Sequence, residues 1–386
     1  MSNFVPFGSI CTLQNGRVFK SEEWADAGTP IVRIQNLNDE TKSFNYCDFE
    51  VERRFHIDSG DLLFSWSGTP GTSFGAFFWN RGKAFLNQHI FRVDVDPELT
   101  DKNYVRYAIN SRLDQIIEQA HGGVGLKHIT KAKLEAVEIP FPPMSEQKRI
   151  AAILDKADAI RSKRRKSIQL ADDFLRAVFL HMFGDPVTNP KRFPMGQIRD
   201  LVAAANYGSS AKASTTEGQY PILRMGNITY QGGLDLRDLK YIDLDEVDEP
   251  KYLVGKGDLL FNRTNSKELV GKTAVYDRDD PVAIAGYLIR IRTNKMGNSY
   301  YICGYLNSAH GKSTLQGVCK SIVGMANINA QEVQNIPIML PPVALQERYQ
   351  EIVTATKARI GKFDDGLELN SRLFDSLSAK AFTGQL

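Results

Sequence analysis

The chain has 386 residues, of which 42% are hydrophobic and 24% charged, the balance of a globular protein large enough for two or three domains. Its net charge of +3 permits a local basic face for nucleic acid but does not require one. No apolar run approaches the roughly 20 residues that span a bilayer, no signal peptide is evident, and the four scattered cysteines favour neither disulfides nor a zinc site. We therefore expect a cytoplasmic protein without membrane contact.

The first 143 residues have the pattern of a mixed α+β domain. Short apolar runs, broken by Gly, Asn and Ser, predict strands, and one longer amphipathic segment predicts a helix. The strands are expected at 31–34, 61–64, 91–95 and 137–141, and the single helix at 104–119.

A long helix is predicted after this domain, over residues 144–184. Pro142-Pro143 cannot continue a helix, whereas Ser145 can cap a new one with Glu146 in its favourable first turn. Apolar residues then recur at helical spacing, and Gly184 marks the end.

The rest of the chain repeats the first part in the same order. Residues 30–36 match 221–227, 60–64 match 257–261, Asn110-Ser111 match Asn307-Ser308, and Pro142-Pro143 match Pro341-Pro342. The separation between matching residues only grows, in small steps, as a tandem duplication with loop insertions produces. The period is far longer than the 20 to 50 residues of solenoid repeats, so each copy is expected to be a whole domain with its own core.

A second long helix follows Pro341-Pro342, where apolar residues recur every three or four positions up to Ala381. Gly361 and Gly366 lie inside it, and since each costs about 1 kcal/mol relative to Ala, the pattern leaves open a kink there. A helix of roughly 38 residues is about 57 Å long and would expose a wide apolar stripe if it stood alone. The two long helices are therefore expected to pack on each other.

The predicted fold class is α+β. Two tandem α/β domains, at 1–143 and 185–342, are separated by two long helices, at 144–184 and 343–386. The helices are expected to form an antiparallel coiled coil, and the duplication gives the arrangement a pseudo-two-fold axis.

Motifs of enzymes are missing from the sequence. Gly311-Lys312-Ser313 and Gly271-Lys272-Thr273 lack the earlier glycine of a phosphate-binding loop, and Glu249-Pro250-Lys251 places a proline where a nuclease site needs a strand, so it is interpreted as a turn. No methyltransferase motif is present, and the six histidines lack metal-ligand spacing. We expect no catalytic residue and no metal ligand.

The ordered features resemble the specificity subunit of type I restriction–modification enzymes. A glycine-containing segment and an apolar strand lead to a double proline, a polar pair and a long helix, and the arrangement occurs twice. The first copy comprises 125–139, Pro142-Pro143 and Glu146-Gln147, and the second comprises 324–338, Pro341-Pro342 and Gln346-Glu347. The helix ends at 179–186 and 381–386 also look like that family's, so the resemblance covers essentially the whole chain.

This resemblance implies that each α/β domain is a target-recognition domain that reads one half of a split target in double-stranded DNA, at a spacing set by the helices. Two methyltransferase subunits would dock on the helices and use S-adenosylmethionine, and motor–nuclease subunits could join them. This chain itself would hold no cofactor and no catalytic residue.

Candidate DNA-reading residues lie in polar segments that differ between the two copies, because different targets need different readers on a shared frame. In the first domain they are Ser65, Trp66, Ser67, Thr69, Asn87, Gln88, His89, Lys127 and His128. In the second they are Asn262, Arg263, Thr264, Asn265, Lys267 and Asn327. Arg33 and Arg224, at matching places in a strand, are expected to contact phosphates or to belong to the frame. An ordinary polar loop remains the alternative at 65–69 and 262–267, and a simple turn at the glycine-containing segments.

Two other interpretations stay open. A freestanding bivalent DNA-binding protein would explain the two domains, although no helix-turn-helix is evident and the long helices offer more surface than two domains need. A self-contained restriction or modification enzyme would need the motifs that are missing. The basic run at 161–166 is expected to be a solvated or partner-facing helix surface rather than a phosphate contact.

Overall fold

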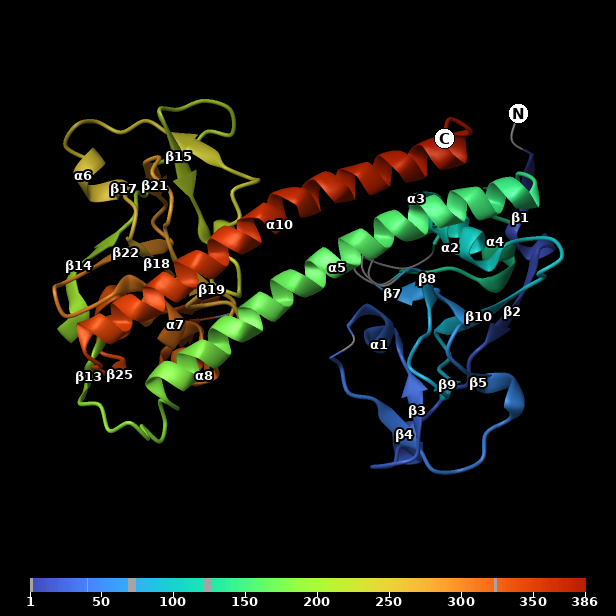
Figure 1. Cartoon of the computed structure of the whole chain (residues 1–386), viewed down its shortest axis with the longest axis horizontal. Coiled ribbons are helices and arrows are strands. Elements are labelled where there is room, and N and C mark those ends of the chain that lie inside the picture. Colours follow the sequence, from blue (N-terminus) through green and yellow to red (C-terminus); the bar gives the residue numbers. More distant parts are fainter. Residues whose placement is uncertain (1–2, 40, 69–73, 121–126, 323–324) are drawn as a thin grey trace. The chain divides into compact units, whose positions relative to one another are not determined.

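The computed structural model describes every residue except 1–2, 40, 69–73, 121–126 and 323–324, and it describes no side chains at 68, 127, 321–322 and 362–370. The chain divides into two units: unit 1 holds residues 1–164 and 365–386, and unit 2 holds residues 165–364. Two long helices, α5 (Met144–Phe183) and α10 (Val343–Thr383), each contribute one half to each unit (Figure 1). Each unit therefore combines a mixed α+β part with helix halves from distant parts of the sequence.

Unit 1 is built on two four-stranded sheets. The first is antiparallel with the order β2-β10-β6-β8, and the second has the order β4-β3-β9-β5, in which β3 and β9 are parallel. Strand β1 pairs with β12, and β7 pairs with β11. The bounds are β1 (Phe4–Pro6), β2 (Cys11–Asn15), β3 (Thr29–Val32), β4 (Asn45–Cys47), β5 (His56–Ile57), β6 (Leu62–Ser65), β7 (Ser67–Gly68), β8 (Gly75–Phe78), β9 (Ala84–Leu86), β10 (Ile90–Val95), β11 (Lys127–His128) and β12 (Glu138–Pro140).

Unit 2 repeats this topology. Its sheets have the orders β14-β22-β18-β20 and β16-β15-β21-β17, again with one parallel pair, β15 and β21, in the second. Strand β13 pairs with β25, and β19 joins β24 and β23. The bounds are β13 (Met195–Gln197), β14 (Val202–Tyr207), β15 (Tyr220–Leu223), β16 (Lys240–Ile242), β17 (Leu253–Val254), β18 (Leu259–Asn262), β19 (Thr264–Asn265), β20 (Thr273–Val275), β21 (Val282–Ile284), β22 (Leu288–Thr293), β23 (Lys320–Ile322), β24 (Met325–Asn327) and β25 (Pro337–Met339).

The single helix predicted at 104–119 is wrong, because each unit has two helices at this place. The hydroxyl of Ser111 donates to the carbonyl of Ala108 (2.7 Å), and that of Ser308 donates to Tyr305 (2.6 Å), so both serines divert backbone acceptors and end the first helix. The shorter helices are η1 (Phe7–Ser9), η2 (Ser21–Glu23), α1 (Ile34–Asn38), η3 (Arg53–Phe55), α2 (Lys102–Asn110), α3 (Leu113–Gln119), α4 (Lys131–Glu135), η4 (Ile198–Leu201), η5 (Met225–Asn227), α6 (Glu249–Tyr252), α7 (Ser299–Asn307), α8 (Ala309–Val318) and α9 (Ala330–Gln334). The expected turn at Glu249-Pro250-Lys251 is the single helical turn of α6.

Both cores join a sheet to the long helices through an equivalent tyrosine. In unit 1 the hydroxyl of Tyr104 donates to the carbonyl of Pro140 (2.6 Å), and its ring lies 5.9 Å from that of Phe382 near the end of α10. In unit 2 the hydroxyl of Tyr301 donates to Met339 (2.8 Å), and its ring lies 4.6 Å from that of Phe183 at the end of α5. Each core is therefore completed by an aromatic side chain from a long helix that began in the other unit.

The helix halves run antiparallel within each unit. In unit 1, Arg149 donates to the carbonyl of Leu386 (2.7 Å), and further along α5 the guanidinium of Arg161 lies 4.3 Å from the ring centre of Phe374. In unit 2, the rings of Phe179 and Phe183 lie 5.6 and 5.5 Å from that of Tyr349 at the start of α10. The predicted fold class, two α+β units with two long helices, is confirmed. Helix α10 also runs through the glycines at 361 and 366 without a break in its backbone.

A buried glutamine ties the start of each long helix to its domain. The side chain of Gln147 accepts from the hydroxyl of Thr100 (2.7 Å) and the backbone N–H of Asp101 (2.9 Å), and it donates to the carbonyl of Pro142 (2.9 Å). The side chain of Gln346 makes the same kind of three-way contact in unit 2, with the N–H of residue 298 and the carbonyls of residues 296 and 341. Both glutamines are 0% exposed. The glutamine of each polar pair after the double proline therefore holds the start of its helix against the domain through buried hydrogen bonds.

We predict that Gln147→Leu destabilises unit 1 by about 2–4 kcal/mol, because it leaves the buried Thr100 and the half-buried backbone groups at 101 and 142 without this hydrogen-bond partner. Urea unfolding followed by circular dichroism measures the change, and the exposed neighbour Lys148→Ala serves as the control. An unfolding profile of Gln147→Leu identical to that of the control would contradict this role.

Candidate DNA interface

Three segments that the sequence predicted separately meet at one place in unit 1. The backbone N–H of Trp66 donates to the carbonyl of His89 (3.2 Å), and the carbonyl of Trp66 accepts from the N–H of Ile129 (3.1 Å). Strands β7 and β11 then pair Ser67 with His128. The residues after β6, the residues before β10 and strand β11 therefore form one surface, with Trp66 at its centre.

Unit 2 repeats this backbone frame bond for bond. The N–H of Arg263 donates to the carbonyl of Tyr287 (3.0 Å), the carbonyl of Arg263 accepts from Ile328 (2.9 Å), and Thr264 pairs with Asn327. The side chains presented on the frame are nevertheless different. Trp66, His89 and His128 of unit 1 are replaced by Arg263, Tyr287 and Asn327.

A glycine in each unit lets the strand that begins the first sheet approach this frame. A Cβ atom on Gly16 would lie 2.1 Å from the carbonyl oxygen of Asn87, and one on Gly208 would lie 2.3 Å from that of Ala285. No side chain fits at such distances, so the backbone contact requires glycine at both places. The sequence interpretation missed this pair, although the two glycines occupy the same place in the repeat.

In unit 1 the frame carries an aromatic and imidazole cluster. The indole Nε1 of Trp66 donates to the side chain of Asn15 (3.3 Å), and the indole lies 5.2 Å from the ring of His89. The Nδ1 atom of His89 is buried and has no hydrogen-bond partner among the described residues. Burial, and then the nearby Arg33 and His128, lower the pKa of His89 from its ordinary value, so the neutral imidazole is favoured at pH 7. A neutral imidazole with an unused nitrogen can accept or donate one hydrogen bond.

In unit 2 the frame carries a cationic cluster. The guanidinium of Arg263 lies 4.7 Å from the ring centre of Tyr207, and its Nη2 donates to the side chain of Asn327 (3.3 Å). The amide of Asn327 donates in turn to the hydroxyl of Thr264 (2.8 Å). The Nε of Arg263 is buried without a partner among the described residues. Arg263 is thus held over an aromatic ring by a cation–π contact and fixed by its hydrogen bond to Asn327.

Four of the predicted DNA-reading residues are too buried for the expected exposed loops. Ser65 and Asn262 end strands β6 and β18 with 0% exposure, and Ser67 and Thr264 are 7% and 8% exposed. The side-chain oxygen of Asn262 accepts from the N–H of Thr264 (3.2 Å). All four side chains belong to the interior of the frame, and those of Ser65 and Asn262 have no exposed surface through which to contact a base.

The remaining candidates are more accessible. Asn87, Gln88, Asn265 and Asn327 are half-buried, and Lys267 is exposed. Lys127 is described only through its backbone, in strand β11, and Thr69 lies outside the described residues.

Arg33 and Arg224 do not lie inside strands, which corrects their predicted position. Arg33 directly follows β3 and Arg224 directly follows β15, and each precedes a short helix. The backbone N–H of Arg33 donates to the side chain of the buried Asn36 (3.1 Å), and that of Arg224 donates to the side chain of the buried Asn227 (2.8 Å). The guanidinium of Arg224 is paired with Asp238 (2.8 Å), whereas that of Arg33 lies 5.5 Å from the ring centre of Trp24. The shared asparagine makes this turn part of the common frame.

The sequence interpretation also missed two residues that contact the central side chains of the frame. Asn15 and Tyr207 end equivalent strands, β2 and β14, and contact Trp66 and Arg263. Since these strands lie far from the frame in the sequence, only the tertiary pairing of β2 with β10 and of β14 with β22 reveals the contact.

Within the described residues, no helix is long and apolar enough to span a membrane, and no group of His, Cys, Asp and Glu side chains could hold a metal ion.

Comparison with known proteins places the chain in a family. Residues 2–171 and 190–362 match the family described as type I restriction modification DNA specificity domain. The EcoKI specificity subunit of Escherichia coli (strain K12) is 25% identical over 99% of this chain and 88% of its own length, and the EcoBI specificity subunit of Escherichia coli is 22% identical over 99% and 85%. The crystal structure of the type I S subunit from M. genitalium shares the fold, with a TM-score of 0.62 and 16% identity over 99% of this chain and 96% of that chain. The chain therefore belongs to the type I restriction–modification DNA specificity family, as a non-catalytic subunit that recognises DNA sequence.

Proposed function

We propose that the chain reads a bipartite DNA target, one half with each unit. The observation that carries this proposal is the frame itself: the same backbone hydrogen bonds hold Trp66, His89 and His128 in unit 1 and Arg263, Tyr287 and Asn327 in unit 2. A backbone frame that is shared by the two units but presents different side chains is suited to the recognition of two different half-site sequences. Requiring a match in both halves multiplies the discrimination that either unit achieves alone.

In unit 2, Arg263 is the proposed base reader. Arginine binds the O6 and N7 acceptors of guanine in the major groove with two parallel hydrogen bonds, the commonest specific contact between side chain and base. The ring of Tyr207 beneath it and the hydrogen bond to Asn327 restrict its orientation. We therefore propose that the half-site of unit 2 contains a guanine read by Arg263.

In unit 1 the proposed readers are side chains carried by the frame around Trp66. They lack an arginine at the central position, so the half-site should differ from that of unit 2. The proposed contacts of unit 1 are Trp66, Thr69, Asn87, Gln88, His89, Lys127 and His128. Those of unit 2 are Arg263, Asn265, Lys267 and Asn327. Arg33 is the better proposed phosphate contact, since the charge of Arg224 is compensated by Asp238.

The long helices are the proposed spacer between half-sites. Helices α5 and α10 have 40 and 41 residues, which corresponds to about 60 Å each at 1.5 Å per residue. We keep the division into two recognition domains, 1–143 and 185–342, joined by the helices at 144–184 and 343–386, as part of this proposal.

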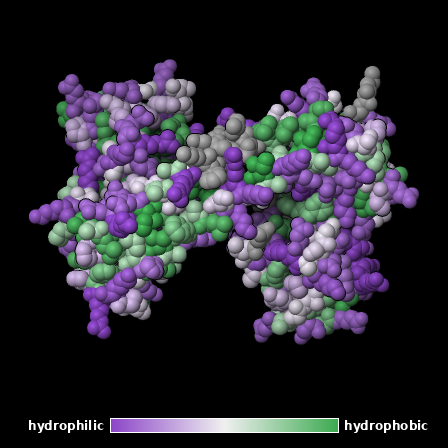
Figure 2. All heavy atoms as spheres, viewed as in Figure 1, coloured by the Kyte–Doolittle hydropathy of each residue, from purple (hydrophilic) through white to green (hydrophobic). Residues whose placement is uncertain are grey.

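Two methyltransferase subunits are the proposed partners, with S-adenosylmethionine bound to them and motor–nuclease subunits joining for restriction. Each unit exposes a large apolar residue at an equivalent helix position: Phe174 of α5 in unit 2 and Leu373 of α10 in unit 1, both 51% exposed. Hydrophobic residues reach the surface among hydrophilic ones in both units (Figure 2). Two equivalent apolar anchors suit two copies of one partner.

We predict that Arg263→Ala relaxes the choice of base at one position of one half-site, because about 1–3 kcal/mol of discrimination is lost with a bidentate contact. Sequencing the methylated sites in a host that carries the variant complex measures this, and Arg278→Ala, an exposed arginine between β20 and β21, is the charge-matched control. Relaxation in both half-sites, or in neither, would contradict the proposal.

A second prediction concerns the spacer. Inserting four residues after Ser167 in α5 and four at the equivalent place in α10, after residue 366, adds about 6 Å to each helix. This should lengthen the gap between half-sites by one or two base pairs of about 3.4 Å each, or abolish methylation, without changing the half-site sequences. Methylation with an unchanged gap would show that the helices are not the spacer.

A third prediction concerns the partners. Phe174→Asp and Leu373→Asp should each remove one methyltransferase copy from a complex that otherwise holds two, since a carboxylate cannot be buried in an apolar contact without a large cost. Native mass spectrometry counts the copies, and Gln169→Asp, at an exposed polar position of α5, is the control. A complex of each variant that still holds two copies refutes the assigned anchors, and a wild-type chain that purifies with none favours a freestanding DNA-binding protein.

A further inference from the structure

The arginine that follows β3 or β15 lies beside the frame in both units. In unit 1, the backbone N–H of Asn87, a frame residue, donates to the carbonyl of Val32 (3.3 Å), and Arg33 is the next residue. The equivalent backbone bond in unit 2 (2.9 Å) joins the frame to Leu223, the residue before Arg224. The same contact therefore places both arginines next to the proposed reader side chains.

The two arginines differ in their charged neighbours. In unit 2, the guanidinium of Arg224 is paired with the carboxylate of Asp238 (2.8 Å). Unit 1 has Ser43 at the matching place: Ser43 and Asp238 lie two residues before β4 and β16, and the backbone carbonyl of each accepts from the buried asparagine of its turn (3.1 and 3.0 Å). Among the described residues, no carboxylate forms an ion pair with Arg33.

Arg33 contacts an exposed indole instead of an acid. Its guanidinium lies 5.5 Å from the ring centre of Trp24, which is 42% exposed. Trp24 directly precedes the residue that bridges to β4, and Ala213 directly precedes the residue that bridges to β16. Unit 2 therefore has a methyl group where unit 1 has an indole. An aromatic face attracts a cation without neutralising its charge, whereas a carboxylate neutralises it.

The charge of Arg33 acts on the frame. Burial, and after it the charge of Arg33, lowers the pKa of His89 from its ordinary value. At the matching place in unit 2, the charge of Asp238 offsets that of Arg224, so the pair carries no net charge. A DNA phosphate beside the frame would therefore be attracted to the turn of unit 1 more strongly than to that of unit 2.

We propose that Trp24 is a positioning residue that holds Arg33 for a contact with a DNA phosphate, and that only unit 1 makes this contact. The cation–π contact restricts the guanidinium before DNA binds, so less conformational entropy is lost when the phosphate contact forms. Asp238 closes the equivalent site in unit 2. This inference rests on the proposed function, because it requires the frame to face DNA.

The salt dependence of DNA binding tests the contact. The full chain, purified with the subunits that it binds, is titrated with a DNA duplex carrying the site that its host methylates, at several salt concentrations. Each neutralised phosphate contributes about 0.9 to the slope of log K against log[salt], because counterions are released. Arg33→Ala should reduce the slope by about this amount. The double variant Arg224→Ala with Asp238→Ser, which removes the ion pair of unit 2, should leave it unchanged.

Exchanging the acid between the units tests why they differ. Ser43→Asp should reduce the slope as Arg33→Ala does, because the new carboxylate compensates Arg33. Asp238→Ser should make the slope steeper, because it leaves the charge of Arg224 uncompensated.

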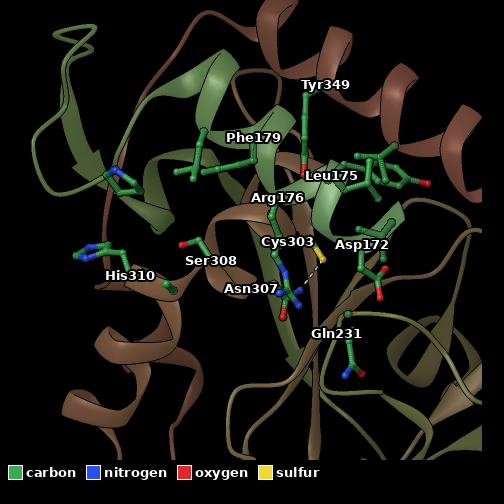
Figure 3. Close-up of a pocket in the computed structure, with 18 of the residues that line it drawn as sticks. Asp172, Leu175, Arg176, Phe179, Gln231, Cys303, Asn307, Ser308, His310 and Tyr349 are labelled. Carbon is green, nitrogen blue, oxygen red and sulfur yellow. Dashed lines mark hydrogen bonds between the residues drawn. The ribbon is translucent and has the colours of Figure 1, made fainter. Parts of the chain in front are cut away.

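Two variants control for the changes of charge. Ser145→Asp adds a carboxylate at an exposed position at the start of α5 in unit 1. Asp172→Ser removes one from the second half of α5, where Asp172 lines a cavity of about 560 Å³ in unit 2 (Figure 3). Neither Arg224 nor Asp238 lines this cavity, so both controls should retain the slope of the unaltered chain.

A double-mutant cycle tests the role of Trp24. Trp24→Ala should weaken binding about two- to ten-fold at constant salt, the cost of ordering one arginine side chain, and Trp24→Phe should retain most of the affinity. In the Arg33→Ala background, Trp24→Ala should have no further effect, because Trp24 acts through Arg33.

The opposite results overturn the proposal. An unchanged slope in Arg33→Ala or Ser43→Asp, or a loss from Trp24→Ala that persists without Arg33, would overturn it while leaving the reading of a bipartite target intact. An unaltered chain that does not bind the duplex would overturn the proposed function as well. Circular dichroism verifies folding, and Ser43→Asp, at an exposed position, keeps the test decisive if Trp24→Ala does not fold.

Discussion

The structure depends on the buried glutamine at the start of each long helix. Gln147 and Gln346 have no exposed surface. Each joins the first turn of its helix to the segment before α2 or α7 through two hydrogen bonds, and a third bond holds the proline segment that precedes the helix. A helix of this length acts as a lever, so a small change of angle at its start becomes a large displacement at its far end. Fixing that angle with buried hydrogen bonds, which are costly to break, gives the proposed spacer a defined direction.

The two units share one backbone frame but differ in the side chains that the frame presents. Backbone hydrogen bonds and the glycines at 16 and 208 define the frame, and these do not depend on which side chains the frame presents. The exchange of Trp66 for Arg263 changes the central side chain from an indole to a cation without altering its two backbone hydrogen bonds or the strand pairing of the next residue. If these side chains are the readers we propose, the fold can acquire a new target by few substitutions.

Much of the fold could be predicted because its signals are local. Short apolar runs located four of the twelve strands of the first domain, β3, β6, β10 and β12. Double prolines with helical periodicity located α5 and α10, and the ordered repeat predicted the topology that the two units share. The division between α2 and α3 was missed, because a serine hydroxyl ends the helix through a contact that periodicity does not show.

The candidate site was predicted less well, because its residues are brought together only by tertiary structure. Ser65 and Asn262 are polar residues at strand ends, and the sequence does not distinguish a buried polar residue that shapes a frame from an exposed one that contacts a ligand. Asn15 and Tyr207 join the site through strand pairing across many residues, which no local pattern predicts.

The order of synthesis has a consequence for how the two units form. Unit 2 is a continuous stretch, residues 165–364, whereas unit 1 needs both the first 164 residues and residues 365–386. A nascent chain can therefore complete unit 2 while the core of unit 1 still lacks Ala381 and Phe382, and the domain made first is the one finished last. Until the final helix emerges, the apolar surface around Tyr104 stays uncovered, which makes the interval between the two events the stage at which this chain most needs protection from aggregation.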